Sequence, residues 1–277
     1  GGMTGNNSCG ARSIRYGNMV HNVLSIEALL ADGSKAHFKK FGEGSENVSE
    51  ALSTQLLNLG RRESKEIDER FPKLLRRVGG YNIDELTKQS PNLGRLLVGS
   101  EGTLGFFQKI HLKLQTIPKE KVLGVCHFPT FYEAMESTQH IVKLDPAAVE
   151  LVDRTMIDLA RAIPLFAPTV DRFVQGEPDA LLLVEFAGED RAEQLSRLAD
   201  LGELMADMGF PDSVVEATDD EFQPAIWEVR KQGLNIMMSM KGDGKPVSFI
   251  EDCAVDLKDL AEYTKRLTEI FEKNGTT

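Results

Sequence analysis

The most apolar stretch of the sequence is residues 180–188, ALLLVEFAG, which is nine residues long. A helix that spans a bilayer needs about 18 or more consecutive apolar residues, so this run is too short to be one. A continuous apolar run of this length, bounded by polar residues, is typical of a strand with both faces buried. We therefore predict that residues 180–188 form the central strand of a covered sheet.

Apolar runs of strand length alternate with segments of helical period on both sides of this strand. Further strands are predicted at 121–128, 147–153, 213–217 and 246–255, and helices at 130–142, 154–163, 191–208, 219–234 and 257–273. This alternation favours an α+β layer with a ferredoxin-like arrangement. Pro118 is predicted to mark the boundary of this domain, which would cover residues 119–277.

The sequence before Pro118 follows a different pattern. A strand from residue 23, a turn at Asp32-Gly33 and a short returning strand predict a hairpin. Residues 93–118 are predicted to form a strand, a glycine loop and a second strand, in which apolar and polar residues alternate over 107–114. Between these segments, residues 46–78 are predicted to be helical. Apolar side chains there fall on one helical face, at Ile67, Phe71, Leu74, Leu75 and Val78.

The charge balance and the cysteines limit the partners and the compartment. The chain carries 32 Lys and Arg against 43 Asp and Glu, a net charge of −11. Binding to nucleic acid requires a basic face, so we predict no nucleic-acid partner. Cys9, Cys126 and Cys253 are far apart and form no CxxC pair, which favours a reducing cytoplasm and predicts no metal site within these residues.

Two glycine-rich stretches before Pro118 are candidates for ligand binding. GGMTGNNSCG occupies residues 1–10 and VGSEGTLGFF occupies residues 98–107. Glycine lacks a Cβ atom, so such loops let backbone amides approach a phosphate or a flavin closely. Neither stretch has the spacing of a Rossmann or P-loop motif. Taken singly, each stretch is also explained by a tight turn with no ligand.

Together, the two stretches resemble those of the FAD-linked oxidase family, flavoproteins of the vanillyl-alcohol-oxidase type. The resemblance implies that residues 1–118 are part of an FAD-binding domain, its second subdomain, and that residues 119–277 are a truncated substrate domain. In that family both loops lie against the FAD. The residues onto which this cofactor role carries over are Gly2, Gly5, Asn6, Asn7, Gly10, Gly99, Ser100, Glu101, Gly102, Thr103 and Gly105.

The resemblance continues into the second half of the chain. The segment IWEVRKQGL is similar to a family segment whose arginine binds the substrate carboxylate, and the match falls on Arg230. A guanidinium group suits this task because it can grip a carboxylate bidentately. Lys245 aligns with a lysine that contacts the acid substrate in relatives of the 2-hydroxyglutarate type. Without the resemblance, Arg230 would be explained by an ion pair with Glu228 or Asp219, and Lys245 by a solvated loop.

The resemblance implies a dehydrogenase that oxidises a D-2-hydroxy acid, 2-hydroxyglutarate or lactate, by hydride transfer to flavin N5. The chain most resembles bacterial proteins in which an FAD module is followed by an iron–sulfur module. Electrons would then leave through that module or a membrane quinone partner, and the protein would be cytoplasmic or peripheral at the inner membrane. Two alternatives stay open, a binding module without a redox role and a nucleotide-sugar reductase with the same FAD fold.

Several family elements have no match in these 277 residues. The loop that holds the FAD pyrophosphate would lie before Gly1, and the residues that hold a divalent metal would lie after Thr277. We therefore expect the chain to be an internal fragment, with any metal or iron–sulfur cluster supplied by other regions. On its own it is expected to bind FAD weakly or not at all and to show no turnover.

Overall fold

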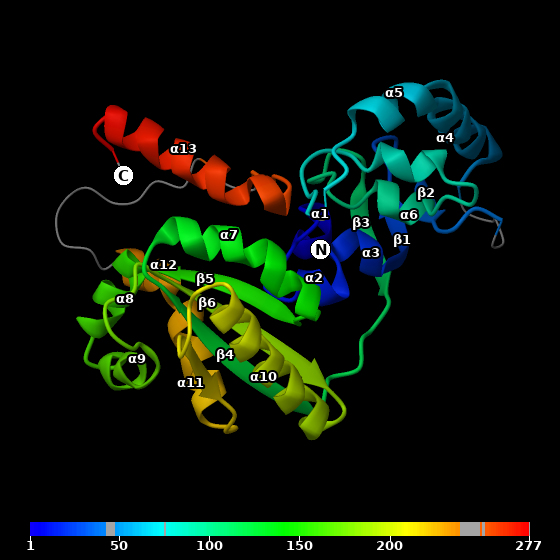
Figure 1. The fold of residues 1–277 in the computed structure, drawn as a ribbon. Coiled ribbons are helices and arrows are strands. Elements are labelled where there is room, and N and C mark those ends of the chain that lie inside the picture. The colour runs from blue at the N-terminus through cyan, green and yellow to red at the C-terminus, as the bar shows by residue number, and fades with distance from the viewer. Residues whose placement is uncertain (43–47, 75, 239–249, 251–252, 277) are drawn as a thin grey trace. The chain divides into compact units, whose positions relative to one another are not determined.

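The computed structural model describes residues 1–42, 48–74, 76–238, 250 and 253–276. The chain divides into two compact units, Gly1–Thr116 and Ile117–Thr277, and each is described by itself. The order of the elements along the chain can be followed by colour in Figure 1.

Unit 1 is built on a small antiparallel sheet. Its strands are β1 (Val23–Leu29), β2 (Lys35–Phe38) and β3 (Phe106–Leu112), in the order β2-β1-β3. The hairpin predicted around Asp32-Gly33 is confirmed, because β1 and β2 pair directly and Gly33 has a φ of +81°. The short helices of the unit are α1 (Gly2–Gly5), α2 (Ser13–Tyr16), α3 (Met19–Asn22), α6 (Leu93–Leu96) and the 3₁₀ helix η1 (Ile83–Thr87).

The strand predicted over residues 107–114 is present as β3, but its strict alternation is interrupted. Lys109 pairs with Glu27 and Phe107 pairs with Ala28, so Gln108 is an extra residue in the ladder. A bulge of this kind changes which side chains share a face. Phe107 and Ile110 consequently both pack against the core of unit 1.

The long helix predicted over residues 46–78 is divided in two and is wrong after Arg70. The structure has two helices, α4 (Glu50–Arg62) and α5 (Ser64–Arg70), and no helix over the described residues from Phe71 to Val78. Pro72 explains the end of α5, because the residue before a proline is disfavoured in the helical conformation. Phe71 accordingly adopts an extended ψ of 128°.

The first strand predicted within residues 93–118 is also wrong. Residues 93–96 form the helical turn α6, capped by the side chain of Asn92, which accepts a hydrogen bond from the Gly94 amide at 2.9 Å. A short apolar run fits a buried helical turn as well as a strand, and the capping asparagine was the available signal.

Unit 2 is a four-stranded antiparallel sheet with helices on both faces. Its strands are β4 (Glu120–Phe128), β5 (Ala148–Asp153), β6 (Ala180–Gly188) and β7 (Val214–Ala217). Their order in the sheet is β5-β6-β4-β7. The first strand in sequence, β4, therefore lies between β6 and β7, and β5 lies at the edge beside β6. This is the predicted ferredoxin-like arrangement. The strand β6 is central and eight of its nine residues are buried, as its composition predicted.

Helices α7 (Phe131–Ile141) and α10 (Arg191–Asp207) cover one face of this sheet, and α13 (Leu260–Lys273) packs on α7. Figure 1 shows α8 (Arg154–Arg161), α9 (Ala167–Phe173), α11 (Phe222–Lys231) and α12 (Gly233–Met238) on the other side. The 3₁₀ helices η2 (Val142–Leu144) and η3 (Leu257–Asp259) complete the unit. The sequence did not predict α9, and most of the strand predicted at 246–255 lies outside the described residues.

Gly124 in β4 lets α10 lie close to the sheet. A Cβ atom at this position would lie 2.6 Å from Leu201 Cδ2 and 3.0 Å from Leu198 Cδ1. Gly124→Ala should therefore destabilise unit 2 by about 1–3 kcal/mol through overpacking.

Gly202, on α10 itself, faces open space. Gly202→Ala should stabilise the unit by about 1 kcal/mol through helix propensity. Urea unfolding of both variants checks the contrast, and a shift of the same sign in both would contradict it.

His127 is a buried histidine of β4 with a structural role. Its Nδ1 atom lies 3.0 Å from the carbonyl oxygens of Val125 and Ser213, and its Nε2 atom lies 3.0 Å from both the carbonyl oxygen of Phe173 and the amide nitrogen of Gln175. Burial lowers its pKa from the ordinary value of 6.5, and the hydrogen bonds to backbone carbonyls oppose this only in part.

The stability of unit 2 should therefore fall as the pH drops below about 6.5. In that range the unfolded chain takes up a proton at His127 and the folded chain does not. The free energy of unfolding should fall by up to about 1.4 kcal/mol for each pH unit from this residue. Urea unfolding between about pH 7 and pH 5 measures the slope, and His127→Gln should make it shallower. An unchanged slope in this variant would refute the assignment.

Candidate functional site

The two glycine-rich stretches lie side by side in unit 1. The backbone amide of Gly99 donates to the carbonyl of Thr4 at 3.0 Å, and that of Glu101 donates to the carbonyl of Gly5 at 2.9 Å. Each stretch also holds a non-glycine residue with a positive φ, Asn7 at 52° and Glu101 at 49°. Such conformations cost energy and are common at functional sites. The sequence separates these loops by about 90 residues, and the fold brings them together.

An open hollow of about 500 Å³ lies where the loops meet. Six of the predicted cofactor residues line it, namely Gly2, Gly5, Asn6, Glu101, Gly102 and Gly105. Gly1, Phe106 and Phe107 complete the lining, and the sequence analysis did not select them. The remaining predicted cofactor residues do not line the hollow, and these are Asn7, Gly10, Gly99, Ser100 and Thr103.

The glycines of the two loops fall into two groups. A Cβ atom at Gly2, Gly5 or Gly102 would meet no atom within 4 Å, so these positions face free space. By contrast, a Cβ atom at Gly99 would lie 3.2 Å from the carbonyl oxygen of Gly80, and one at Gly105 would lie 3.0 Å from that of Leu29. Gly99 and Gly105 thus permit the close packing of the fold. Gly2, Gly5 and Gly102 leave space in which a flat ligand can lie against the backbone.

Side chains behind the loops hold their shape. Asn7 is fully buried, and its Oδ1 atom accepts a hydrogen bond from the Val20 amide at 2.9 Å. Asn82 is also buried, and its Nδ2 atom donates to the carbonyl of Val98 at 2.7 Å. The hydroxyl groups of Tyr81 and Thr103 lie 2.8 Å apart. The sequence analysis did not select Tyr81 or Asn82, because their partners lie far along the chain.

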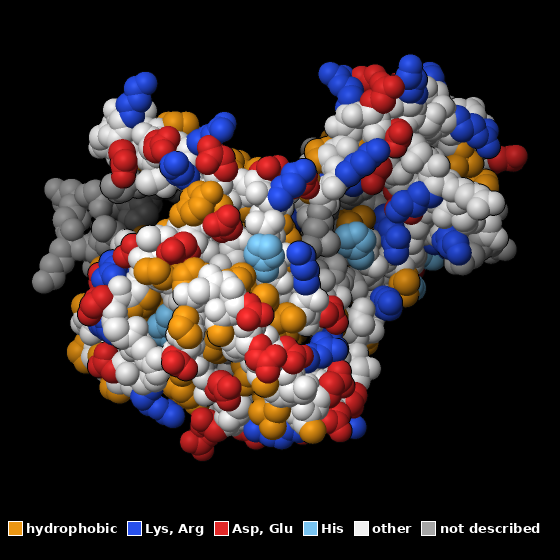
Figure 2. Space-filling model, viewed as in Figure 1, with side chains coloured by type: hydrophobic (Ala, Val, Ile, Leu, Met, Phe, Trp, Pro, Cys, Tyr) orange, Lys and Arg blue, Asp and Glu red, His pale blue; other side chains and the backbone are white. Residues whose placement is uncertain are grey.

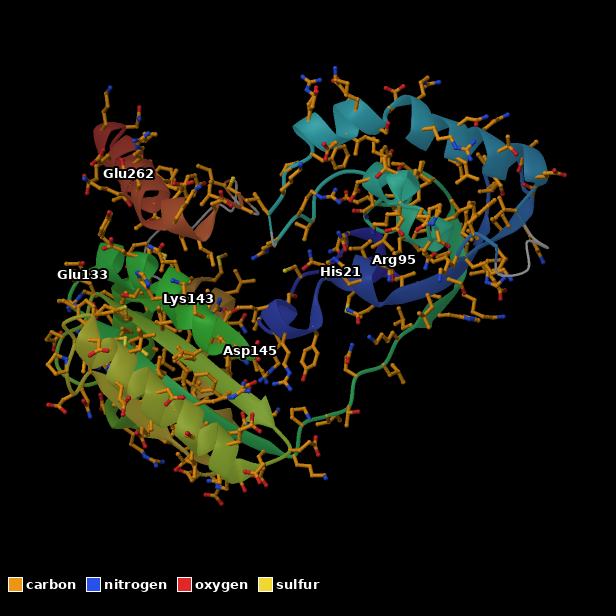
Figure 3. The ribbon with its side chains drawn as sticks, turned by 45° about the vertical axis from the view of Figure 1, so that its right-hand side comes forward. His21, Arg95, Glu133, Lys143, Asp145 and Glu262 are labelled. Atoms are coloured by element: carbon orange, nitrogen blue, oxygen red, sulfur yellow. The ribbon has the colours of Figure 1, made fainter. Side chains whose placement is uncertain are left out.

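Arg95 connects α6 to the start of β1, next to His21 (Figure 3). Its guanidinium group donates to the carbonyl of His21 at 3.3 Å and to that of Val23 at 3.4 Å. Burial and the positive charge of Arg95 lower the pKa of His21. The Nδ1 atom of His21 accepts a hydrogen bond from the Asn18 amide at 2.9 Å. His21 and Arg95 thus fix α3 and α6 beside the glycine loops.

Arg230 lies in the last turn of α11 and forms an ion pair with Glu150 of β5, with 2.7 Å between Nη2 and Oε2. The sequence placed Glu228 and Asp219 near this arginine, and neither is the partner in the structure. Glu228 accepts a hydrogen bond from Gln232, and Asp219 accepts from the amide of Phe222 at the start of α11. The ion pair therefore joins two elements that are distant in sequence.

Lys245 lies outside the described residues. Within the described part of the chain, no cluster of three or more His, Cys, Asp or Glu side chains could hold a metal ion. No described helix is both long and apolar enough to cross a membrane. Acidic side chains are interspersed with Lys and Arg on the surface that Figure 2 shows.

Comparison with known proteins gives the family. The model of the C-terminal domain of FAD-linked oxidases matches residues 117–277, which is the whole of unit 2. The match covers more than half of the chain. The chain therefore belongs to the FAD-linked oxidase family.

Curated relatives match the chain over almost its whole length. D-2-hydroxyglutarate dehydrogenase of Pantoea ananatis is 29% identical over 99% of this chain and 29% of its own length. The enzyme of the same name from Escherichia coli is 28% identical with the same coverage, and D-lactate dehydrogenase of Archaeoglobus fulgidus is 28% identical over 99% of this chain and 49% of its own. The chain thus spans less than a third of the first two relatives.

A solved structure of an alkyldihydroxyacetonephosphate synthase is similar in fold. The two structures superpose with a TM-score of 0.52 at 16% sequence identity. The superposition covers 86% of this chain and 36% of the synthase chain. At this identity the likeness concerns the fold alone.

Proposed function

We propose that this chain is part of an FAD-dependent dehydrogenase that oxidises a D-2-hydroxy acid, 2-hydroxyglutarate or lactate, to the 2-oxo acid. The observation that carries the proposal is the meeting of the two glycine loops around one open hollow in a chain of the FAD-linked oxidase family. The names of the relatives supply the substrate class.

The hollow in unit 1 is the proposed contact surface for FAD. Gly2, Gly5 and Gly102 leave space for the cofactor, and Asn6 and Phe106 are exposed at the lining. Phe106 is 70% exposed, and a flat aromatic ring stacked on it would bury it. When bound, FAD would supply the hydride acceptor for the oxidation.

Arg230 is the proposed binding residue for the substrate carboxylate, and Lys245 is proposed to assist it. An arginine fixes both the position and the rotation of a carboxylate because it can donate two parallel hydrogen bonds. Fixing the carboxylate orients the neighbouring C2–H bond, which is the bond that must break. The electron acceptor is proposed to be an iron–sulfur module or a membrane quinone.

A screen of substrates tests this function in the natural polypeptide that contains these residues. The purified protein is expected to contain FAD and to lose the visible absorbance of oxidised flavin with D-2-hydroxyglutarate or D-lactate. Glycolate serves as the third substrate. Its C2 atom carries a second hydrogen in place of the methyl group of lactate or the carboxylate-bearing chain of 2-hydroxyglutarate. A protein that contains no flavin, or whose flavin neither D-2-hydroxyglutarate nor D-lactate reduces, would refute the proposal.

A further inference from the structure

The ion pair of Arg230 has a feature that its proposed role does not explain. A carboxylate beside an arginine offsets the positive charge that would attract an anionic substrate. Glu150 lies with its Oε2 atom 2.7 Å from Arg230 Nη2, and its side chain is only 20% exposed. The ion pair thus weakens the electrostatic attraction of Arg230 for an anionic substrate. If Arg230 binds the substrate, Glu150 must contribute to binding in another way.

Glu150 is held on a rigid part of unit 2. It is paired with Leu183 in the ladder between β5 and the central strand β6. Its neighbours Val149 and Leu151 pack against the core that α7 and α10 cover. Because strand side chains alternate, Glu150 projects from the opposite face of the sheet. Its carboxylate is therefore a fixed point, set by the sheet and not by a loop.

Arg230, by contrast, is long and carried by the end of a helix. An untethered arginine side chain loses rotamer entropy when it is held in one position. Its Nη1 atom lies near Gly233, where an added Cβ atom would be 3.6 Å away. Its Nε atom is buried, with no hydrogen-bond partner among the described residues. The ion pair at Nη2 and the burial of Nε thus restrain the guanidinium group at two of its nitrogen atoms.

We infer that Glu150 is a positioning residue that holds the guanidinium group of Arg230 in place for a substrate carboxylate. The inference rests on the proposed function, since it takes Arg230 as the carboxylate-binding residue. Glu150 reduces the attraction for the anion but removes the cost of ordering Arg230 each time substrate binds. This is preorganisation of a binding group by a support on a rigid element.

Two measurements test the inference, and the first does not depend on activity. In the 277-residue chain, ¹⁵N relaxation of the Arg230 Nε–H group reports how firmly the side chain is held. The signal is assigned by its loss in Arg230→Lys. We expect the wild-type side chain to be as ordered as the backbone of α11, and Glu150→Ala to make it mobile. A mobile Arg230 in the wild type, or an Arg230 unaffected by Glu150→Ala, would overturn the inference.

The second measurement is made in the natural polypeptide that contains the chain. Glu150→Ala should raise KM for the D-2-hydroxy acid about tenfold, because Arg230 must then be ordered on binding. Glu150→Gln keeps an oxygen that can accept from Arg230 and should stay within about threefold of the wild type. Glu216→Ala, at an exposed glutamate of β7, is the matched control and should leave KM unchanged.

The possible results separate the inference from the proposed function. A lower melting temperature in Glu150→Ala with unchanged KM would give Glu150 a purely structural role and overturn the inference. A lower KM in Glu150→Ala would mean that Glu150 competes with the substrate, which also overturns it. If the wild-type protein oxidises no 2-hydroxy acid, the proposed function fails, and the relaxation measurement still decides whether Glu150 restrains Arg230.

Discussion

Arg230→Ala should reduce kcat/KM for D-2-hydroxy acids by about a hundredfold or more. Two charge-assisted hydrogen bonds to a carboxylate together contribute at least about 3 kcal/mol, and a loss of 1.4 kcal/mol corresponds to a factor of ten. Arg230→Lys should recover only part of the loss, because an ammonium group keeps the charge but not the planar pair of donors. Steady-state kinetics of the flavin-loaded natural polypeptide measure both variants.

Lys231 provides the matched control for this prediction. It is the next residue on α11, carries the same charge and is exposed. Lys231→Ala should leave kcat/KM within about twofold of the wild type, as is usual for an exposed residue away from a site. Equal losses in Arg230→Ala and Lys231→Ala would indicate a general effect of helix charge and would contradict a specific carboxylate contact.

Gly5→Val should weaken FAD binding by about ten- to a hundredfold. The new side chain would occupy the hollow between the glycine loops, and overpacking of this kind costs about 1–3 kcal/mol. The fold itself should tolerate the change, because a Cβ atom at Gly5 meets no protein atom within 4 Å. Fluorescence titration of the natural polypeptide with FAD measures the affinity, and thermal unfolding checks that the protein is folded.

Gly202→Val is the control for the loss of flavin. Gly202 is also a helical glycine that faces open space, but it lies on α10 of unit 2. This variant should retain FAD as the wild type does. If Gly5→Val retained flavin with unchanged affinity, the hollow in unit 1 would not be the cofactor surface.

Much of the fold could be predicted because it depends on local patterns. The apolar run 180–188 and the helical periods of residues 130–142 and 191–208 each determine one element, and the structure has all three. The side chain of Thr130 accepts from the Glu133 amide, as that of an N-cap residue does. The errors over 71–78 and 93–96 arose where a short apolar run fits more than one conformation and a neighbouring Pro72 or Asn92 decides the outcome.

The candidate site was less predictable because it depends on contacts between distant residues. The glycine stretches could be selected by their composition, but their pairing through Gly99 and Glu101 required the fold. Phe106 and Phe107 line the hollow because the strand β3 begins there, and their composition alone indicated only a strand. Glu150 could have been noticed as a carboxylate in a predicted strand, but nothing in the sequence connects it with Arg230, 80 residues later.

Transfer of hydrogen from C2 of a D-2-hydroxy acid to the flavin is the central claim, and rapid anaerobic mixing tests it most directly. The natural polypeptide that contains these residues is mixed with D-2-hydroxyglutarate or D-lactate, each with hydrogen or deuterium at C2, and with the L-enantiomers. We expect one D-enantiomer to reduce the flavin, more slowly when deuterated, and the L-enantiomers to reduce it slowly or not at all. Flavin that no D-2-hydroxy acid reduces, or that both enantiomers reduce equally, would contradict the account.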